Sequence, residues 1–410
     1  MPATPPSNRR NFILSSAATT LAAGALTNSA TSQVAASPIQ PATASKVRVG
    51  IIGSTGRGNY GHGVDVAFTK LPQVEIVALA DDNPKGLEEA SQRTHPQKTY
   101  ADYRQMLAQE ELDVVAICPR WIDQHHDMIV AAAKAGCHIY MEKPFCRTLL
   151  ECDSAIKELD ARRLKLGIAH VSQYSPVLEV VKNLIEQDEI GEILELRGRG
   201  KEDHRGGGED LWVLGSHVLG LMRKVAGSDA TSCTAIMQAQ GHPVTKADVI
   251  AGAEGLGPLA GDHVQATYAF EHGVFGYFAS KKAAGGSPSR FGIQILGSKG
   301  IIEMTTGYLE PAYLLRDTAW SPGRTGASWT QVTSAGIGRP EPRNDGNYEG
   351  GHMAAINDLL ESIQQDRPTL CSAHDCRQIT EMISAVFESH RVGQTVTLPL
   401  ATRVHPLTLL

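Results

Sequence analysis

A glycine-rich turn followed by an acidic strand end is where residue types and spacing first point to chemistry in this sequence. The turn follows the apolar residues 46–52 and consists of Gly53, Ser54, Thr55, Gly56, Arg57 and Gly58. Glycines let the backbone turn sharply and approach a pyrophosphate, which then lies against the amides of a helix N-terminus. The next predicted strand ends at Asp81 and Asp82, where an acidic side chain accepts a hydrogen bond from a ribose hydroxyl. Together these residues predict a dinucleotide site.

The turn fits the fingerprint G-x-G-x-x-G only in part, which leaves two points open. Its first and last glycines match, but the middle position is Thr55, with the glycine displaced to Gly56. A carboxylate at the strand end repels a 2′-phosphate and so favours NAD, while Lys85 and Arg57 keep NADP open. The alternative interpretation of the stretch is a glycine-rich turn with an acidic helix cap.

Apolar runs alternate with helical stretches in the region that contains this turn. Predicted strands cover residues 46–52, 74–80, 114–118 and 138–141. Helices are predicted between them, including residues 103–110 and 127–135. Strands that alternate with helices predict βαβ units and an open, doubly wound parallel sheet, which is an α/β domain of the Rossmann type.

The pattern changes from Pro176 onward. An amphipathic helix over residues 177–185 is followed mainly by strand-like runs, at residues 193–197, 264–270, 274–280, 291–296 and 300–304. This order predicts a second, α+β domain built on a mostly antiparallel open sheet. A long loop is expected over residues 319–351, a helix over 352–364 and a closing strand over 396–400. We therefore divide the chain into residues 1–45, 46–168 and 169–410.

The composition excludes several classes of partner. The chain has 410 residues, enough for about two domains, and it combines 42% hydrophobic residues with a net charge of −6. It contains no basic stripe, so nucleic acid and anionic membranes are not expected as partners. The seven cysteines lack paired metal-ligand spacing, and no such cluster accompanies His125-His126. No metal site is therefore expected.

The first 45 residues have the pattern of an export signal. Arg9-Arg10 precede the weakly apolar residues 13–26, and a Ser/Ala/Thr/Pro tract follows. This order is typical of the bacterial twin-arginine route, which exports folded proteins. The apolar stretch is too short for a spanning helix of roughly 20 apolar residues, and the segment has no cysteine for a lipid anchor. We expect a periplasmic protein that uses the twin-arginine machinery. A disordered tail with two chance arginines is the alternative.

A series of short motifs resembles the Gfo/Idh/MocA family, named for glucose–fructose oxidoreductase and inositol dehydrogenase. Besides the glycine turn, the motifs are Val77-Ala-Leu-Ala-Asp81, Ile117-Cys-Pro119, His125, Ala135-Gly136, Glu142-Lys143-Pro144, Gly206-Gly-Gly208, Gly215-Ser-His217, Leu296-Gly-Ser-Lys-Gly300 and Val396-Thr-Leu-Pro-Leu400. Each is unspecific alone, but their order and spacing over about residues 46–400 are specific. The resemblance implies a Rossmann domain joined to a sheet-containing substrate domain, with nicotinamide held between the two.

The same resemblance assigns catalysis to Lys143 and His217. Lys143 would contact both the cofactor and the reacting hydroxyl, and burial there would lower its pKa, which suits proton transfer near neutrality. We expect its peptide bond to Pro144 to be cis. His217 would take the carbinol proton while hydride leaves the same carbon for the nicotinamide. The family often has Asp four residues before and three residues after this histidine, where this sequence has Val213 and Gly220.

Further residues are expected to contact the cofactor or the substrate. Those expected at the cofactor are Pro119, Arg120, Trp121, His125, Glu142 and Gln173. Those expected at the substrate are Tyr174, Asp210 and Trp212. Asp210 either orients a sugar hydroxyl or caps a helix. Trp212 either offers its flat face to a pyranose or belongs to the core.

Export constrains the mechanism because no pool of NAD exists outside the cytoplasm. Retention for hours requires release at about 10⁻⁴ per second, hence a dissociation constant of about 10⁻¹⁰ M. We expect an NAD(P)-dependent oxidoreductase that acts on a sugar, sugar-derivative or cyclitol hydroxyl and recycles its cofactor internally. The alternative is a redox-neutral, NAD-dependent glycoside hydrolase. A third is a non-catalytic sugar-binding homologue, against which Lys143 and His217 argue. The resemblance also implies a homo-oligomer formed through the open face of the C-terminal sheet.

Overall fold

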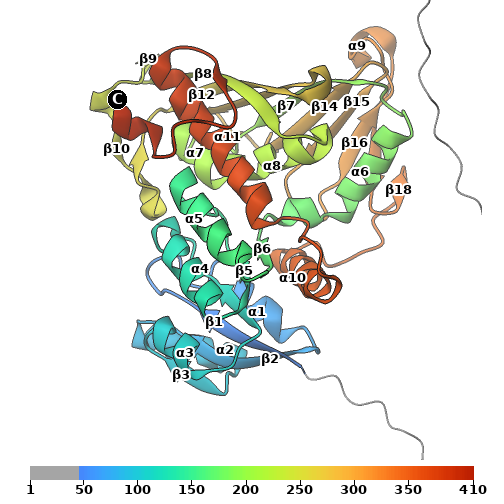
Figure 1. Cartoon of the computed structure of the whole chain (residues 1–410). Coiled ribbons are helices and arrows are strands. Elements are labelled where there is room, and N and C mark those ends of the chain that lie inside the picture. Colours follow the sequence, from blue (N-terminus) through green and yellow to red (C-terminus); the bar gives the residue numbers. More distant parts are fainter. Residues whose placement is uncertain (1–45) are drawn as a thin grey trace, which may run out of the picture. The chain divides into compact units, whose positions relative to one another are not determined.

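The computed structural model describes residues 46–410 (Figure 1). The predicted export signal, residues 1–45, lies outside the described residues. Two large sheets, one short two-stranded sheet and the helices packed on them make up the described part.

The first large sheet is parallel, with its strands in the order β3-β2-β1-β4-β5-β6. Its strands are β1 (Val47–Ile52), β2 (Val74–Ala80), β3 (Lys98–Tyr100), β4 (Val114–Ile117), β5 (His138–Met141) and β6 (Leu166–Ile168). The helices between them are α1 (Val64–Thr69), α2 (Pro84–Thr94), α3 (Tyr103–Gln109), α4 (His125–Lys134) and α5 (Leu149–Asp160). This strand order is that of dinucleotide-binding folds, whose ligands lie beyond the carboxyl ends of the strands where β1 and β4 diverge. The predicted α/β class is confirmed.

The second large sheet has the order β18-β17-β16-β15-β14-β7-β13-β12-β8-β19, with β9 paired to β8. Its strands are β7 (Ile193–Arg199), β8 (Ala230–Ala239), β9 (His242–Pro243), β12 (His263–Phe270), β13 (Phe275–Lys281), β14 (Gly292–Gly297), β15 (Ile301–Thr305), β16 (Ala312–Leu315), β17 (Thr330–Thr333), β18 (Gly336–Ile337) and β19 (Val396–Thr397). Within it β7 and β13 run parallel, and every other neighbouring pair is antiparallel. The predicted, mostly antiparallel second sheet is confirmed.

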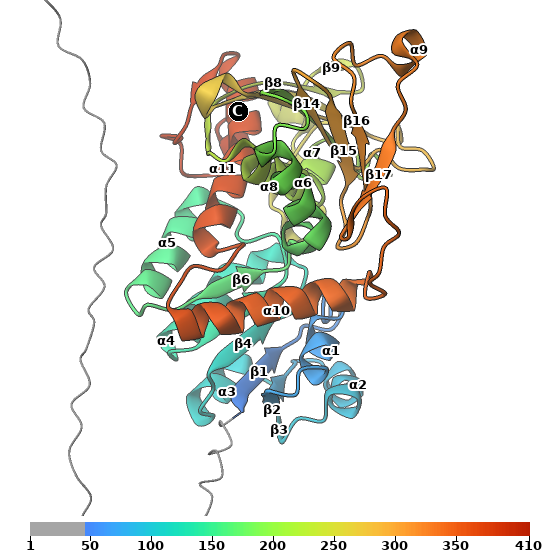
Figure 2. The ribbon, with the colours of Figure 1, turned by 90° about the vertical axis from the view of Figure 1, so that its right-hand side faces the viewer.

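Helices cover one face of the second sheet. They include α6 (Pro176–Glu186), α7 (Gly208–Val213), α8 (Gly215–Ala226) and α11 (Ala373–Val392). Figure 2 shows α6, α8 and α11 on the same side of the strands. Short β10 (Ile250–Ala251) and β11 (Pro258–Leu259) form a separate antiparallel hairpin.

The C-terminal part of the chain differs most from the sequence-based expectation. The expected loop over residues 319–351 instead contains α9 (Pro322–Thr325), β17 and β18, and α10 (Tyr348–Gln365) begins within it. The short strands add to the sheet edge through tertiary pairing, which local sequence does not signal. Helix α11 was not predicted. Its residues from Ile379 to Ser389 are buried on every face, which removes the polar stripe that marks an amphipathic helix.

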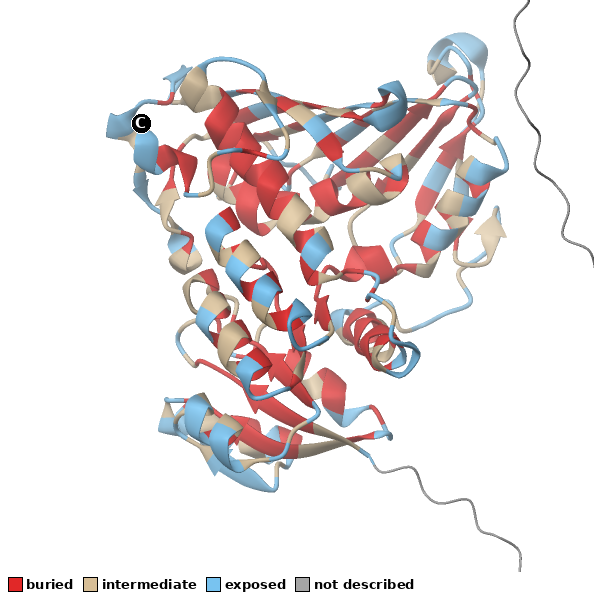
Figure 3. Cartoon of the chain, viewed as in Figure 1, coloured by how far each residue is buried: buried red, intermediate tan, exposed pale blue. Residues whose placement is uncertain are grey.

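The packing brings the two sheets together around one set of loops. Helix α10 contacts α1 and β6, while α11 contacts α5, α8 and β8, so the end of the chain joins both sheets. Figure 3 shows the central strands of the first sheet and much of α11 as buried. The loops after β1, β4 and β5 therefore share one sheet edge, next to α8. Within residues 46–410, none of the helices has the length and apolarity needed to cross a bilayer.

Candidate active site

The glycine turn after β1 is held in place by an acidic side chain. The Asp81 carboxylate accepts hydrogen bonds from the Thr55 amide at 3.2 Å and from the Thr55 hydroxyl at 2.7 Å. It also accepts the Asn83 amide at 3.0 Å, and it is buried. Asp81 also lines the pocket beside the turn, so its contact with a ribose stays a prediction, and its oxygens in addition fix the turn. Its neighbour Asp82 is exposed and lines the adjoining pocket.

Thr55 stands where the fingerprint has its middle glycine, and the structure makes room for its side chain. Its hydroxyl oxygen lies 1.8 Å from where a side-chain Cβ on Gly86 would stand, so α2 can pass only because residue 86 is glycine. The sequence analysis did not single out Gly86. A glycine in the first turn of a helix is unusual, and that position could have indicated a close contact there. Gly58, with φ +91°, approaches Arg120 so closely that a Cβ would lie 2.4 Å from the Arg120 amide nitrogen. The turn thus packs against the loop after β4.

These residues fit the predicted dinucleotide. A pocket of about 280 Å³ lies at the carboxyl ends of β1 and β2, bordered by Gly53, Ser54 and Asp82. A Cβ on Gly56, whose φ is +89°, would meet no atom within 4 Å, so the turn presents bare backbone on that side. The helix after the turn begins only at Val64, and the Gly56 amide is held by the Asn59 side chain at 2.9 Å. Fewer amides therefore point outward than the fingerprint predicted.

The loop after β4 forms a cationic and aromatic wall beside the turn. The Arg57 guanidinium lies over the Trp121 ring, 4.7 Å from its centre, and pairs with Asp123. His125 was predicted to face the cofactor, but it is buried, and its ring nitrogens each lie 2.7 Å from a carbonyl oxygen, of Pro119 and Pro144. Burial lowers the pKa of His125, so the neutral ring donates to one of these carbonyls. It joins the loops after β4 and β5 and does not contact the pocket.

The β10–β11 hairpin reaches this wall from the second domain. At its turn, a Cβ on Gly255 would lie 2.6 Å from the Asp123 carboxyl carbon. The neighbouring Glu254 carboxylate lies 3.7 Å from the Arg120 guanidinium. We name residues 250–259 the clasp, because they contact the first domain on the side of the glycine turn.

Lys143 lies at the carboxyl end of β5, and its peptide bond to Pro144 is cis, as predicted. Its ammonium donates to the carbonyl of Val213 at 2.9 Å. Burial lowers the pKa of Lys143, opposed by the charges of Glu142 and Glu254. The side chain is 8% exposed, so two of its three N–H bonds remain for groups in the adjoining pocket.

The carboxylate of Glu142 connects this strand end to the glycine turn. It accepts the His62 amide at 2.9 Å, the His62 Nδ1–H at 2.7 Å and the Lys143 amide at 3.1 Å. Burial alone would raise the pKa of Glu142, but the hydrogen bond from His62 and the charges of His62 and Lys143 hold it well below its usual range. Glu142 is therefore ionised, and its predicted place beside the cofactor becomes a supporting one.

His217 is paired with a second histidine that the sequence analysis missed. The Nδ1 atoms of His217 and His170 lie 3.4 Å apart, with the rings nearly perpendicular at 4.9 Å. Burial lowers the pKa of His217 well below its ordinary value and that of His170 to about 3. Both rings are thus neutral near pH 7, and one donates to the other.

The structure brings the two predicted catalytic residues to one pocket of about 180 Å³. Its lining residues are His62, Glu142, Lys143, Ala169, Val171, Ser172, Lys201, Leu214, His217, Phe291, Thr306, Gly307, Tyr348 and His352. His62 was missed because it lies beyond the glycine turn, between Gly61 and Gly63, and its partner Glu142 is 80 residues away in the sequence.

The three residues expected at the substrate do not line this pocket. Asp210 is buried, and its carboxylate accepts the amides of Lys201 at 3.2 Å and Glu202 at 3.0 Å, so it anchors a loop. Trp212 is 1% exposed and packs against His405, so its ring has no free face for a sugar. The Tyr174 hydroxyl is buried beside Gly167 of β6. The expectation that these three side chains contact the substrate was therefore wrong. They lie in short helical segments, whose sequence does not show which side faces a cavity.

Gln173, expected near the cofactor, lies against α8 instead. Its amide nitrogen is 2.4 Å from where a Cβ on Gly220 would stand, and the amide has no hydrogen-bond partner among residues 46–410. Gln173 therefore fills the space beside Gly220, one of the two positions at which the family resemblance leads us to expect an aspartate. Among these residues, we find no cluster of three or more side chains suited to a metal ion.

Comparison with known families agrees with this geometry. The model described as "Oxidoreductase family, NAD-binding Rossmann fold" matches residues 47–170, and its companion, "Oxidoreductase family, C-terminal alpha/beta domain", matches residues 182–398. The chain belongs to the Gfo/Idh/MocA family. The predicted class of activity, an NAD-dependent oxidoreductase, and the predicted cofactor, NAD, are thereby confirmed.

Individual members of the Gfo/Idh/MocA family are similar at lower identity. Levoglucosan dehydrogenase from Pseudarthrobacter phenanthrenivorans is 24% identical over 284 residues, which cover 61% of this chain and 72% of the relative. A glycosyl hydrolase family 109 protein from Shewanella sp. is 26% identical over 228 residues, 49% of each chain. A solved structure of levoglucosan dehydrogenase with NADH and levoglucosan has a TM-score of 0.70 at 20% identity, over 87% of this chain and 100% of that one, and shows the shared fold.

The His170–His217 pair predicts a loss of stability in acid. The pKa of His170 is lowered in the folded state, so below about pH 6.5 the unfolded chain binds a proton that the folded chain does not. The free energy of unfolding should therefore fall with pH from about 6.5 toward 3, by up to about 1.4 kcal/mol per pH unit for each such group. Urea unfolding at several pH values should show a shallower loss for His170→Asn. The exposed control His204→Asn should keep the wild-type slope, and an unchanged slope in His170→Asn would contradict the assignment.

Proposed function

We propose that this protein is an exported oxidoreductase that removes hydride from a sugar hydroxyl and keeps its NAD bound between turnovers. The observation that carries this proposal is the shared pocket of Lys143 and His217, at the carboxyl edge of an NAD-binding domain. Relatives that include a levoglucosan dehydrogenase support a carbohydrate hydroxyl as the reacting group.

The residues of the pocket divide the work of oxidising an alcohol. NAD, when bound, accepts the hydride of the carbinol carbon. The hydroxyl proton passes to the neutral imidazole of His217, whose low pKa leaves a lone pair free at pH 7. Lys143 holds the oxygen, since its ammonium is fixed by the Val213 carbonyl and has further N–H bonds to donate.

The clasp supports tight retention of the cofactor. Asp82 and Ser54 would hold the adenosine end, while Arg57 and Arg120 would lie near the pyrophosphate. The clasp contacts Arg120 and Asp123 from the other domain, so a bound dinucleotide would leave only after these contacts open. Such a barrier lowers the release rate without requiring new contacts to the cofactor. Export through the twin-arginine route, proposed from Arg9-Arg10, makes this retention necessary.

A second candidate is a redox-neutral glycoside hydrolase that uses the bound NAD transiently. The similarity to a glycosyl hydrolase family 109 protein favours it, although only 49% of that relative is covered. In such a reaction the hydroxyl is first oxidised, the neighbouring C–H becomes acidic, and a glycosidic oxygen is eliminated before water adds and the hydride returns.

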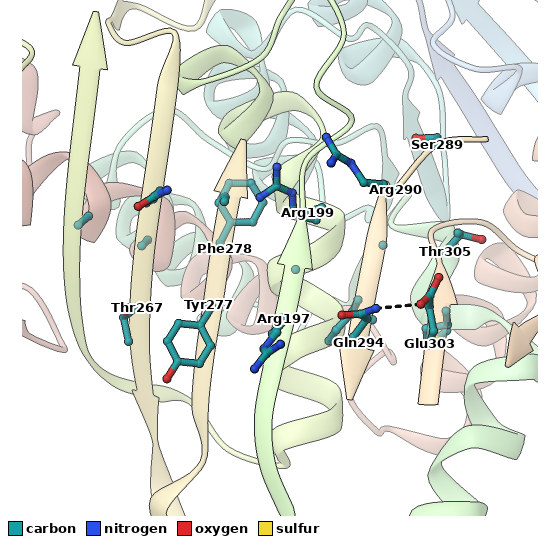
Figure 4. Close-up of a pocket in the computed structure, with 18 of the residues that line it drawn as sticks. Arg197, Arg199, Thr267, Tyr277, Phe278, Ser289, Arg290, Gln294, Glu303 and Thr305 are labelled. Atoms are coloured by element: carbon teal, nitrogen blue, oxygen red, sulfur yellow. Dashed lines mark hydrogen bonds between the residues drawn. The ribbon is translucent and has the colours of Figure 1, made fainter. Parts of the chain in front are cut away.

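We also propose that the open face of the second sheet joins two copies of the chain. A hollow of about 790 Å³ lies on it, and Figure 4 shows Thr267, Tyr277 and Arg197 side by side on adjoining strands. Ile236 on this face is 61% exposed and Tyr277 is 38% exposed. Large apolar side chains gathered on one exposed surface are typical of contact sites between proteins.

The first test is the cofactor content of the exported protein. Dilution outside the cytoplasm removes any loosely held cofactor, so only tightly bound cofactor remains on protein recovered from the periplasmic fraction. Denaturing this protein, expressed from the full-length chain, should therefore release about one nicotinamide dinucleotide per chain. A panel of sugars added to the holoprotein without free NAD should then produce reduced nicotinamide absorbance. Cleavage of aryl glycosides under the same conditions would favour the hydrolase. Protein confined to the cytoplasm, or protein that is empty after export, would contradict the proposal.

The second test concerns the clasp and uses two glycines in one hairpin. In Gly255→Ala the new methyl group would overlap Asp123, so the clasp should lift and nicotinamide release should accelerate about tenfold, a change of about 1.4 kcal/mol. Gly257→Ala is the matched control, because its φ of +82° imposes similar strain while no atom lies within 4 Å of the new methyl. Release can be followed by diluting each holoprotein and collecting free cofactor by filtration. Equal release from both variants would rule out the clasp.

The third test measures the molecular mass in solution. Light scattering should give a dimer or larger assembly for the intact protein, and Ile236→Lys should shift it toward the monomer because a charge would be buried at the interface. Leu150→Lys is the control, since Leu150 is 59% exposed on α5 of the other domain and should leave the mass unchanged. A monomeric wild-type protein would overturn this assignment of the sheet face.

A further inference from the structure

His62 is a further proton-carrying side chain in the pocket of Lys143 and His217, and it is paired with a carboxylate, that of Glu142. Its ring donates from Nδ1 to Glu142 at 2.7 Å, and its backbone amide donates to the same oxygen at 2.9 Å. The ring also stacks on Tyr348 of α10, with centres 5.1 Å apart and planes inclined by 28°. Contacts from two elements thus fix the orientation of this imidazole.

The hydrogen bond to Glu142 determines which nitrogen of His62 is free. Glu142 is ionised and can only accept, so in the neutral form of the His62 ring the hydrogen lies on Nδ1. The other nitrogen, Nε2, then carries a lone pair, and it makes no hydrogen bond within residues 46–410. A carboxylate that fixes the tautomer of a histidine in this way also stabilises the imidazolium that forms when the ring takes a proton.

Two of the three imidazoles that line the pocket, those of His62 and His217, come from different domains. His62 stands between the glycine turn and α1 of the NAD-binding domain, whereas His217 lies on α8 of the second domain. Both line the same pocket of about 180 Å³, together with Lys143. Oxidation of an alcohol needs one group to take the hydroxyl proton, and the His217–His170 pair with Lys143 supplies it. A second, separately supported base is more than that reaction requires.

We propose that His62 removes the proton from the carbon next to the one that is oxidised, so that the site catalyses enolisation of its bound keto-sugar. This inference rests on the proposed function, because the C–H bond becomes acidic only after the neighbouring hydroxyl has become a carbonyl. It deepens that function by assigning a second chemical step to the same pocket.

The step balances with groups already in the pocket. The proton of the neighbouring C–H goes to Nε2 of His62, and the electron pair of that bond forms a carbon–carbon double bond. The π pair of the carbonyl moves to its oxygen, where the Lys143 ammonium donates a hydrogen bond to the developing charge. Where the next carbon carries a glycosidic oxygen, the enolate pair expels it, and that oxygen takes the proton from His62. Where it does not, the proton returns to carbon.

The test separates proton exchange from hydride transfer in the intact holoprotein. In D₂O, with a sugar that reduces the bound nicotinamide, recovered sugar should carry deuterium at the carbon next to the oxidised one, detected by mass spectrometry and NMR. Stopped-flow absorbance at the nicotinamide band measures reduction in the same samples. In His62→Gln the ratio of the exchange rate to the reduction rate should fall by about 100-fold, the contribution typical of a general base.

Three further variants make the result specific. His62→Ala should regain exchange when imidazole is added to the buffer, which a purely structural role of His62 would not allow. Lys143→Met should lose reduction and therefore exchange, while it retains bound cofactor. His374→Gln, a largely exposed histidine on α11, should keep the wild-type ratio.

The failures of the two proposals can be told apart. Reduction of the nicotinamide without deuterium incorporation, or a wild-type ratio in His62→Gln, would overturn the role of His62 and leave the oxidoreductase proposal standing. No reduction with any sugar would overturn the proposed function and this inference with it.

Discussion

The buried carboxylate of Glu142 is the interaction on which the rest of the site depends. It is 1% exposed and accepts three N–H groups, two from His62 and one from Lys143. An ionised carboxylate left unpaired in such a place would cost several kcal/mol, so the glycine turn and the strand end of β5 must stay together. Gly61, at φ +64°, makes this approach possible, because a Cβ there would lie 2.5 Å from the Glu142 side chain.

Two further buried carboxylates, those of Asp210 and Glu202, hold the loop that carries Lys201. Asp210 holds the backbone of Lys201 and Glu202, and Glu202 is itself held by Arg199 at 2.6 Å and Arg290 at 2.7 Å. Lys201 lines the pocket, while Arg199 and Arg290 border the hollow on the open face of the sheet. The pocket and the open face of the sheet therefore share one loop, so contacts made on that face would act on the pocket through Glu202.

The sequence predicted the structure well wherever a local run of apolar residues is also buried in the fold. Buried parallel strands such as β2 and β5 are short apolar runs, and their strand ends could be placed from the sequence alone. The motifs that contain Lys143 and His217 also predicted that the two side chains would meet, because the order of the motifs along the chain indicated the fold of the family. The direction in which a side chain points could not be predicted in the same way. Trp212 stands among glycines and acids in sequence, yet tertiary packing buries it against His405.

His62 and Asp81 show a different limit. Each stands in or near a stretch that was predicted to bind the cofactor, and each makes hydrogen bonds within the protein that only the folded backbone brings into range. Asp81 fixes Thr55, which compensates for the missing glycine, and Glu142 reaches back across 80 residues to His62. Contacts across such distances depend on the strand order of the sheet and leave no local sequence pattern.

The missing aspartates at positions 213 and 220 acquire a physical meaning from these contacts. Val213 supplies its backbone carbonyl to the Lys143 ammonium, and Gln173 fills the space above Gly220. A carboxylate next to the Lys143 ammonium would favour its charged form and raise its pKa, whereas the Val213 carbonyl oxygen carries no net charge and burial lowers that pKa. A lysine that gives up its proton more readily is better suited to exchange protons with a substrate oxygen. The absence of an acid at position 213 therefore affects how the site sets the proton affinity of Lys143, while Lys143 and His217 still share one pocket.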